Sequence, residues 1–242
     1  MTIHDTGLYA RSFADVYDQW YGTLDDPADL VASLRQVMPA PATVIELGSG
    51  TGRLATPLRN AGYRVIAVDV SLEMLGAAPA GPHRVAGDMA RLPIAATTAD
   101  AVIVAYNTLF NLTSVQLQQE CFDETRRVLR AGGVFAVETF VAPTAPQTTF
   151  GLSSRAHPTD PTATLRILTG PDPLDPDIVV GSHIELGSHT ACRPWRLAYQ
   201  TPDQLDRCAA QADLTLMRRA ADWADAAFGD DSGRHVSWYI TR

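Results

Sequence analysis

The sequence predicts an α/β fold, in which a doubly wound, mostly parallel sheet carries an inserted antiparallel sub-sheet. A short apolar strand at 44–47 runs into a glycine-rich turn and a helical segment at 54–60, which Gly62 is placed to end. Apolar runs that read as buried strands recur up to residue 140, with helical patterns between them. From residue 141 to about 200, prolines and strand-like runs replace this alternation.

The glycine-rich turn has the features of a nucleotide-binding corner. Free backbone N–H groups at the start of a helix, and the missing side chains of Gly48, Gly50 and Gly52, let a ligand lie against the main chain. The next strand, at 63–70, ends in Asp69, about where an acidic side chain would accept both ribose hydroxyls. The dinucleotide fingerprint needs a third glycine where this chain has Arg53, so an NAD-linked oxidoreductase is disfavoured. The structural alternative is a turn that only tightens a strand–helix connection.

Composition excludes several classes of partner. The chain has 242 residues, of which 46% are hydrophobic, enough for one large domain with an elaborated insertion. A net charge of −8 argues against a nucleic-acid partner. No apolar run reaches membrane-spanning length and the first residues do not resemble a signal peptide, so we expect a cytoplasmic protein without a membrane partner. Cys121, Cys192 and Cys208 are far apart and lack zinc-ligand spacing, so we expect reduced thiols and no metal site.

An aromatic helix is expected at the N-terminus, over residues 8–24. Apolar residues recur there at helical steps: Phe13, Val16, Tyr17, Trp20, Tyr21 and Leu24. We expect this apolar stripe to pack on the rest of the domain. A second helix at about 27–37 then leads to the first strand.

Polar and aromatic residues follow the next strands where a ligand crevice is expected. Ser71 is a plausible N-cap, and Met74, one turn on, can lie against a planar base. A third strand at 84–89 ends in Asp88, which can accept a hydrogen bond from an exocyclic amine or only cap a loop. The most apolar strand, 101–105, runs into Tyr106 and Asn107, which either face the crevice or form a turn before a helix cap.

The remaining pattern predicts one more amphipathic helix, the sub-sheet and a closing unit. The helix, at 116–130, is expected to stop at Gly132 and Gly133, and the strand 134–140 carries the unusual charge Glu138 near its end. In the sub-sheet, Ile178, Val180, Ile184 and Leu186 alternate with Val179, His183 and Glu185, and the three predicted strands are 163–169, 178–186 and 193–200. The third strand has an apolar face of Trp195, Leu197 and Tyr199. The closing unit is a helix with a capping box, Thr201 to Gln204, and two strands at 214–220 and 235–240.

The pattern Glu46-x-Gly48-x-Gly50-x-Gly52 resembles motif I of the class I S-adenosylmethionine-dependent methyltransferases. Asp88-Met89 is similar to the adenine-contact motif of that family, and the run Ala-Asp-x-Tyr-Asp-x-Trp-Tyr at 14–21 resembles the N-terminal helix of its bacterial small-molecule members. These motifs cover about 13–140, and beyond them the resemblance is architectural. It implies a Rossmann-like, seven-stranded sheet closed by an antiparallel strand. The implied division is an N-terminal helical lid (1–40), a cofactor-binding core (41–140), an inserted region (141–200) and a return to the core (201–242).

The resemblance implies S-adenosyl-L-methionine as the cofactor and assigns roles to individual residues. The implied cofactor-binding residues are Tyr17, Tyr21, Glu46, Gly48, Gly50, Gly52, Arg53, Asp69, Val70, Met74, Asp88, Met89 and Tyr106. Those expected near the acceptor are Tyr17, Trp20, Asn107, Phe110 and Phe140. Arg53 departs from the small residue common at its position, and could pair with the methionine carboxylate or with an acidic acceptor. The inserted region would shape the acceptor pocket or contact a second copy in a homodimer.

The implied activity is methyl transfer by in-line displacement to a nitrogen, oxygen or carbon of a small molecule, such as a natural product. A neutral amine needs no strong base before attack, whereas a hydroxyl or a carbon acid does. The candidate bases are Glu138, His157, His183 and His189, although a lone histidine is more often structural. Two alternatives stay open: a methyltransferase fold that cyclises or only binds its ligand, and, least favoured, a non-enzymatic interaction module.

Overall fold

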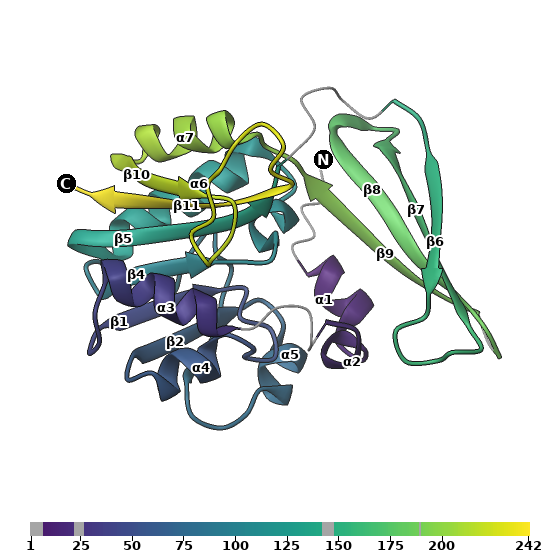
Figure 1. Ribbon diagram of the computed structural model, residues 1–242, viewed down its shortest axis with the longest axis horizontal. Coiled ribbons are helices and arrows are strands. Elements are labelled where there is room, and N and C mark those ends of the chain that lie inside the picture. Colours follow the sequence, from purple (N-terminus) through teal and green to yellow (C-terminus); the bar gives the residue numbers. More distant parts are fainter. Residues whose placement is uncertain (1–6, 22–26, 142–147, 189) are drawn as a thin grey trace.

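The computed structural model describes residues 7–21, 27–141, 148–188 and 190–242, and these form two sheets with two short helices between them (Figure 1). The larger sheet has seven strands in the order β10-β11-β5-β4-β1-β2-β3. Strands β3, β2, β1, β4 and β5 are parallel neighbours, and β11 and β10 add antiparallel pairs at one edge. The smaller sheet is antiparallel, in the order β6-β7-β8-β9. This arrangement confirms the predicted fold class.

The strands of the larger sheet are β1 (Thr43–Leu47), β2 (Arg64–Asp69), β3 (His83–Ala86), β4 (Ala99–Val104), β5 (Leu129–Phe140), β10 (Leu214–Ala220) and β11 (Arg234–Thr241). All five residues of β1 are buried, and so are five of the six in β4. Burial on both faces explains why these strands are continuously apolar in the sequence instead of alternating. Their carboxyl ends meet at one edge of the sheet, which is the position predicted for the ligand crevice.

Helices cover both faces of this sheet. One core cluster joins α3 (Pro27–Val37) and α4 (Ala55–Asn60) to one face. The other joins α6 (Val115–Val128) and α7 (Pro202–Gln211) to the opposite face. The short α5 (Leu72–Ala77) and the 3-10 helix η1 (Thr108–Asn111) lie next to the carboxyl ends of β2 and β4. Thr201 and Gln204 form the predicted capping box of α7. Within the described ranges, every helix is too short or too polar to span a lipid bilayer.

The predicted boundary between α6 and the next strand was wrong. The helix ends at Val128, and β5 starts immediately at Leu129, so Gly132 and Gly133 lie inside the strand and do not terminate the helix. Leu129 pairs with Ala99 and Val134 with Ala101, so the strand carries an irregularity here. Gly132 has a φ of 73°, which a glycine adopts without steric cost.

The N-terminal aromatic segment forms two helices, α1 (Leu8–Phe13) and α2 (Tyr17–Tyr21), so the single helix predicted over 8–24 was wrong. A tight turn between them lets Phe13 and Trp20 meet edge to face, with ring centroids 6.2 Å apart. Leu24, the last member of the predicted stripe, lies outside the described residues. Helix α3 packs with the main core and not with α1 and α2: its Leu30 and Leu34 are buried there.

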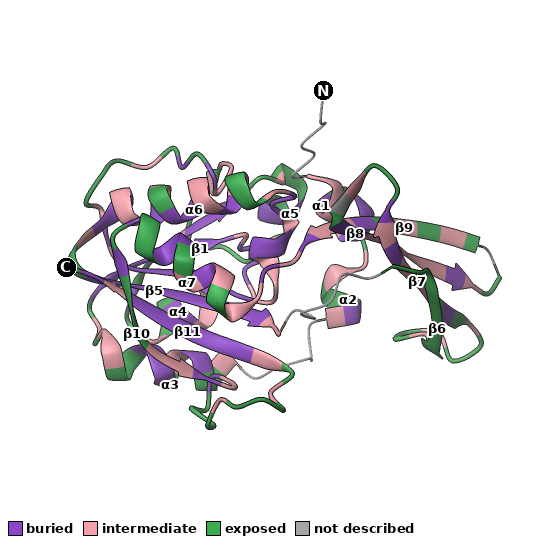
Figure 2. Ribbon diagram, turned by 90° about the horizontal axis from the view of Figure 1, so that it is seen from above, coloured by how far each residue is buried: buried purple, intermediate pink, exposed green. Residues whose placement is uncertain are grey.

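The smaller sheet consists of β6 (Gly151–Ala156), β7 (Thr164–Asp172), β8 (Asp175–Leu186) and β9 (Thr190–Ala198). Strand β6 was not predicted, because it is an edge strand whose six residues are all exposed and show no apolar alternation (Figure 2).

Burial along β8 is not confined to one of the two alternating sets of residues. On β8, Ile178 is buried, but Ile184 and Leu186 are only half-buried, and Val179 and Glu185 of the alternate set are buried as well. The reason is that α1 and α2 cover the face that carries Val179, forming a third core cluster from Phe13, Trp20, Leu165, Val179 and Trp195.

Candidate active site

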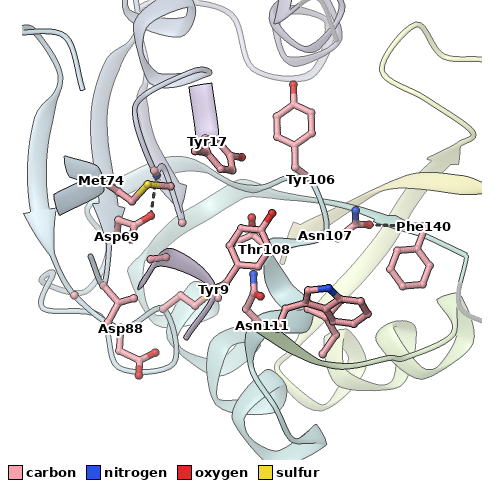
Figure 3. A pocket seen from close by; sticks show the side chains of 18 of the residues that line it. Tyr9, Tyr17, Asp69, Met74, Asp88, Tyr106, Asn107, Thr108, Asn111 and Phe140 are labelled. Carbon is pink, nitrogen blue, oxygen red and sulfur yellow. Dashed lines mark hydrogen bonds between the residues drawn. The ribbon is translucent and has the colours of Figure 1, made fainter. Parts of the chain in front are cut away.

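A cavity of about 330 Å³ lies at the carboxyl ends of the main strands, enclosed by α1 and β9 (Figure 3). Predicted residues that line it are Tyr17, Gly48, Gly50, Asp69, Val70, Met74, Asp88, Met89, Tyr106, Asn107, Phe140 and His183. Residues that no motif had pointed to also line it: Tyr9, Ala10, Gly87, Thr108, Asn111, Trp195, Leu197 and Tyr199. Most of this second group comes from α1, η1 and β9, so the cavity joins segments that are far apart in the sequence.

Asp69 fastens the glycine loop to the end of β2. Its Oδ2 accepts a hydrogen bond from the Gly50 N–H at 2.8 Å, and its Oδ1 accepts one from the Ser71 N–H at 2.8 Å. Ser71 caps α5 by accepting from the Met74 N–H, as predicted. Burial raises the pKa of Asp69, while the N–H groups of Ser71 and Gly50 oppose that rise by stabilising the carboxylate. Both carboxylate oxygens therefore hold the main chain that forms the cavity wall.

Gly48 lets the turn after β4 approach the glycine loop closely. It has a φ of 65°, and a Cβ atom added there would lie 2.1 Å from Thr108 Cγ2. No larger residue fits in this geometry, because such a contact is far inside van der Waals distance. The close approach puts Tyr106, Asn107 and Thr108 directly beside the glycine loop.

Glu46 lies behind the loop, is 4% exposed and does not line the cavity. Its Oε2 has no hydrogen-bond partner among the described residues. Burial, and secondarily the nearby Asp69, raise the pKa of Glu46 to about 8. The Glu46 carboxyl can therefore still bind a positively charged or hydrogen-bonding group.

This raised pKa predicts a pH-dependent loss of stability that Glu46→Gln removes. A carboxyl whose folded pKa exceeds its unfolded value favours folding while it is protonated, and that contribution is lost as pH rises from about 4.5 to about 8. Between those values, the wild type is expected to lose up to about 1.4 kcal/mol per pH unit relative to Glu46→Gln. Urea unfolding of both proteins at pH 5, 6.5 and 8 measures the difference. Parallel stability curves for the two proteins would contradict the assignment.

A strained turn forms the wall opposite the glycine loop. Tyr106 and Asn107 both adopt left-handed backbone conformations, with φ of 54° and 63°. The end of β5 holds them: Glu138 Oε2 accepts from the Tyr106 N–H at 3.1 Å, and Asn107 Oδ1 accepts from the Phe140 N–H at 2.6 Å. Each non-glycine residue in this backbone conformation destabilises the fold by about 1–2 kcal/mol. Such strain is typical of functional sites, where the side chains must keep one position.

A second cavity of about 290 Å³ adjoins the first. The two share Tyr9, Tyr17, Tyr106, Asn107 and Phe140, and the second adds Tyr21, Arg53, Glu138, Thr139 and Arg234. The guanidinium of Arg53 lies 3.6 Å above the Tyr106 ring and donates to the Tyr21 carbonyl at 2.5 Å. Glu138 Oε1 is 3.6 Å from Arg234. Charged groups thus gather in the second cavity, next to the tyrosines that separate it from the first.

An aromatic wall faces the strained turn from the side of β9. Phe140 meets Tyr199 edge to face at 4.7 Å, and Phe110, itself fully buried, supports both rings from behind. His183 of β8 also lines the first cavity, and its Nδ1 is buried without a partner among the described residues. Burial, together with Arg155 and Arg193, lowers the pKa of His183 to about 4, so the imidazole is neutral at pH 7.

The structure does not bring every predicted site residue to these cavities. His157 pairs with Glu185 at 3.2 Å and accepts from the Asp160 N–H, which is a structural role on the smaller sheet. Trp20 is buried in the third core cluster, and Gly52 lies outside the lining of both cavities. His189 lies outside the described residues.

Two polar contacts join α2 to the loop after β1. Thr51 donates to Asp18 at 2.5 Å, and Arg53 makes the contact with the Tyr21 carbonyl. On its other side, the α1–α2 pair is held to β9 by Arg193, which donates to the Ser12 carbonyl at 2.7 Å and to both oxygens of Asp15. The pair therefore covers the cavity from a position fixed to both sheets.

Comparisons with known proteins find several methyltransferases. The model of the methyltransferase-domain family matches residues 45–137. The CcbJ methyltransferase from Streptomyces caelestis is 32% identical, with a TM-score of 0.86 over 98% of this chain and 100% of its own. CalS10 from Micromonospora echinaspora, an amino pentose methyltransferase solved with bound S-adenosylmethionine, has a TM-score of 0.69 at 19% identity, covering 89% of this chain and 90% of its own.

Among curated relatives, the demethylmenaquinone methyltransferase of Renibacterium salmoninarum is 35% identical over 107 residues, which is 42% of each chain. The chain spans less than half of the length of the curated relatives that it matches.

Proposed function

The chain belongs to the class I S-adenosylmethionine-dependent methyltransferases, and from this premise we propose that it methylates a nitrogen atom of a small-molecule amine. S-adenosylmethionine carries an activated methyl group on a sulfonium, so it supplies the electrophile. The part left to the protein is to hold that methyl group in line with a lone pair of the acceptor and to exclude water.

The residues around the first cavity fit this cofactor. The glycine loop offers main chain without side chains, and the buried Glu46 Oε2 and Ser49 Oγ have no partners among the described residues. We assign Asp69 to the ribose, Asp88 and Met89 to the adenine, and Val70 and Met74 to the faces of the nucleoside. Glu46, Gly48, Gly50 and Gly52 would hold the methionine end, with Tyr17, Tyr21, Arg53 and Tyr106 around it.

We choose nitrogen as the acceptor atom because of the chemical groups that line the acceptor side of the cavity. Among the described residues there, His183 is a weak base, and burial raises the pKa of both Tyr9 and Tyr17, so their hydroxyls stay protonated. Glu138 is engaged by the Tyr106 N–H and lies near Arg234. A neutral amine attacks without losing a proton first, whereas a hydroxyl or carbon acid requires a competent base. These groups suit orientation of an amine better than activation of an alcohol.

The amino pentose methyltransferase similar to this chain gives the proposal further support, since its match covers most of both chains. The demethylmenaquinone methyltransferases match only 42% of this chain, so they bear less on the acceptor. Tyr9, Asn107, Asn111, Phe140, Trp195 and Tyr199 then form the acceptor pocket.

Incubation with methyl-labelled S-adenosylmethionine and a panel of amines, phenols and quinols tests this function. We expect label in amines and S-adenosylhomocysteine as the second product. Label only in phenols or quinols would show that the acceptor atom is oxygen or carbon and not nitrogen. Saturable cofactor binding without any methylated product would favour a protein that cyclises or only binds its ligand.

Replacement of Arg53 by alanine is expected to weaken binding of S-adenosylhomocysteine or of the acceptor at least several-fold. The change removes a cation that lies 3.6 Å above Tyr106 and that holds α2 through the Tyr21 carbonyl. Isothermal titration calorimetry gives the first affinity, and the acceptor KM at saturating cofactor gives the second. Arg59→Ala, an exposed change in the helix α4 that follows Arg53, is the matched control. An unchanged affinity for S-adenosylhomocysteine and an unchanged acceptor KM in Arg53→Ala would show that Arg53 is not part of the site.

A further inference from the structure

The side chain of Asn107 can present only one kind of group to a ligand. Its Oδ1 faces the Phe140 N–H at 2.6 Å, as the dashed line in Figure 3 shows. A main-chain N–H never accepts a hydrogen bond, so the amide cannot be flipped end for end at this position. Its Nδ2 therefore faces away from Phe140, and it has no hydrogen-bond partner among the described residues. Asn107 offers an N–H donor there and nothing else.

The backbone keeps this donor at the boundary between the two cavities. Asn107 lines both, and its left-handed φ of 63° is fixed by the Phe140 contact and by donation from its own N–H to the Glu138 carbonyl at 3.3 Å. The adjoining Thr108 packs against Gly48 of the glycine loop. The donor is thus rigid and lies next to the part of the cavity assigned to the methionine end of the cofactor.

A complementary acceptor lies one turn along the chain. Asn111, at the end of η1, also lines the first cavity, and its Oδ1 is buried without a partner among the described residues. A ligand that supplied an N–H or O–H to Asn111 and a lone pair to Asn107 would satisfy both asparagines. Across from them, Trp195, Leu197 and Tyr199 provide an apolar surface for a ring.

Building on the proposed N-methylation, we infer that the acceptor is an amine whose nitrogen lies in or on a ring and that carries a hydrogen-bond-accepting oxygen close to this nitrogen, and that Asn107 Nδ2 donates to this oxygen. Asn107 is then a specificity-determining residue: it distinguishes such amines from analogues that lack the oxygen. Asn107 is half-buried, so a bound ligand would cover its Nδ2. A donor covered in this way and left without a partner is costly, and sites built to bind a hydroxyl discriminate strongly against molecules without one.

Matched pairs of amines test this inference. The probes are trans-2-aminocyclohexanol against cyclohexylamine and 3-hydroxypyrrolidine against pyrrolidine. The readout is the ratio within each pair of kcat/KM, calculated on the concentration of neutral amine, at saturating S-adenosylmethionine. The wild type is expected to favour the hydroxylated member at least ten-fold. Asn107→Asp keeps an oxygen for the Phe140 N–H but loses the donor, so its ratio is expected to fall to near one. The ratio cancels any general loss of activity or of cofactor affinity.

Two further variants keep the result interpretable. Asn107→Gly removes the donor while relieving the left-handed strain, so we expect it to fold and to lose the same preference. Asn60→Asp adds the same charge at an exposed position and is expected to keep the wild-type ratio. A wild-type ratio near one, or a preference that survives in both Asn107 variants, overturns the inference and leaves N-methylation intact. Absence of methylation of every amine, with S-adenosylhomocysteine still bound, overturns the proposed function as well.

Discussion

Gly48→Ala is expected to abolish measurable binding of S-adenosylhomocysteine and to destabilise the fold strongly. A φ of 65° costs an L-residue about 1–2 kcal/mol, and the new Cβ would lie 2.1 Å from Thr108 Cγ2, which adds about 1–3 kcal/mol for forcing the two segments apart. The glycine loop and the turn that carries Asn107 would both move. Urea unfolding measures the stability, and calorimetry with S-adenosylhomocysteine measures the loss of binding, which we expect to exceed 100-fold.

Two companion variants separate the causes of this loss. Gly132 has a similar φ of 73°, but a Cβ there meets nothing within 4 Å, so Gly132→Ala isolates the backbone strain. Thr108→Ser removes the clashing methyl group and is expected to restore part of the stability of Gly48→Ala. Equal destabilisation by Gly48→Ala and Gly132→Ala would show that the contact with Thr108 does not matter.

Asp69→Asn is expected to weaken S-adenosylhomocysteine binding at least 100-fold, or about 2.7 kcal/mol. Each carboxylate oxygen accepts from a main-chain N–H, of Gly50 or of Ser71, and an asparagine would turn an NH₂ toward one of them. The variant would also lose the charge assigned to the ribose hydroxyls. Because the same side chain fastens the loop, we expect a stability loss of about 1–3 kcal/mol alongside the loss of binding.

Asp100 provides the control for that variant. It also accepts from a main-chain N–H, that of Thr43 at 2.7 Å, and pairs with Arg130, but it lines neither cavity. Asp100→Asn should therefore cost stability without changing the affinity for S-adenosylhomocysteine. If both variants bind the ligand as the wild type does, Asp69 has no part in the cofactor site.

The cofactor half of the site was predictable because its determinants are local. Gly48, Gly50 and Asp69 lie within one strand–turn–helix–strand unit, so their spacing in the sequence fixes their positions in space. The buried strands were predictable for the same reason, since burial on both faces leaves a continuous apolar run. The boundary between α6 and β5 was not, because Gly132 and Gly133 suit a helix end as well as an irregularity within a strand.

The acceptor half depends on contacts between distant segments. Tyr9, Asn111 and Tyr199 meet only because α1, η1 and β9 converge, and no spacing in the sequence encodes that convergence. His157 and His183 looked equivalent in the sequence, but β8 directs His183 to the cavity, whereas Glu185 holds His157 elsewhere. The choice of face on β8 likewise depended on α1 and α2 covering it. For Tyr9 the nearest available signal was the aromatic stripe that begins four residues later.

The third core cluster, formed by α1, α2 and the smaller sheet, shares no buried residue with the two clusters of the main sheet. Mutations that enlarge or reshape the pocket from that side alter packing that is separate from the packing beneath the glycine loop. Substitutions on the smaller sheet, at Trp195 or Leu197, can therefore reshape the acceptor side of the pocket without disturbing the core beneath the glycine loop.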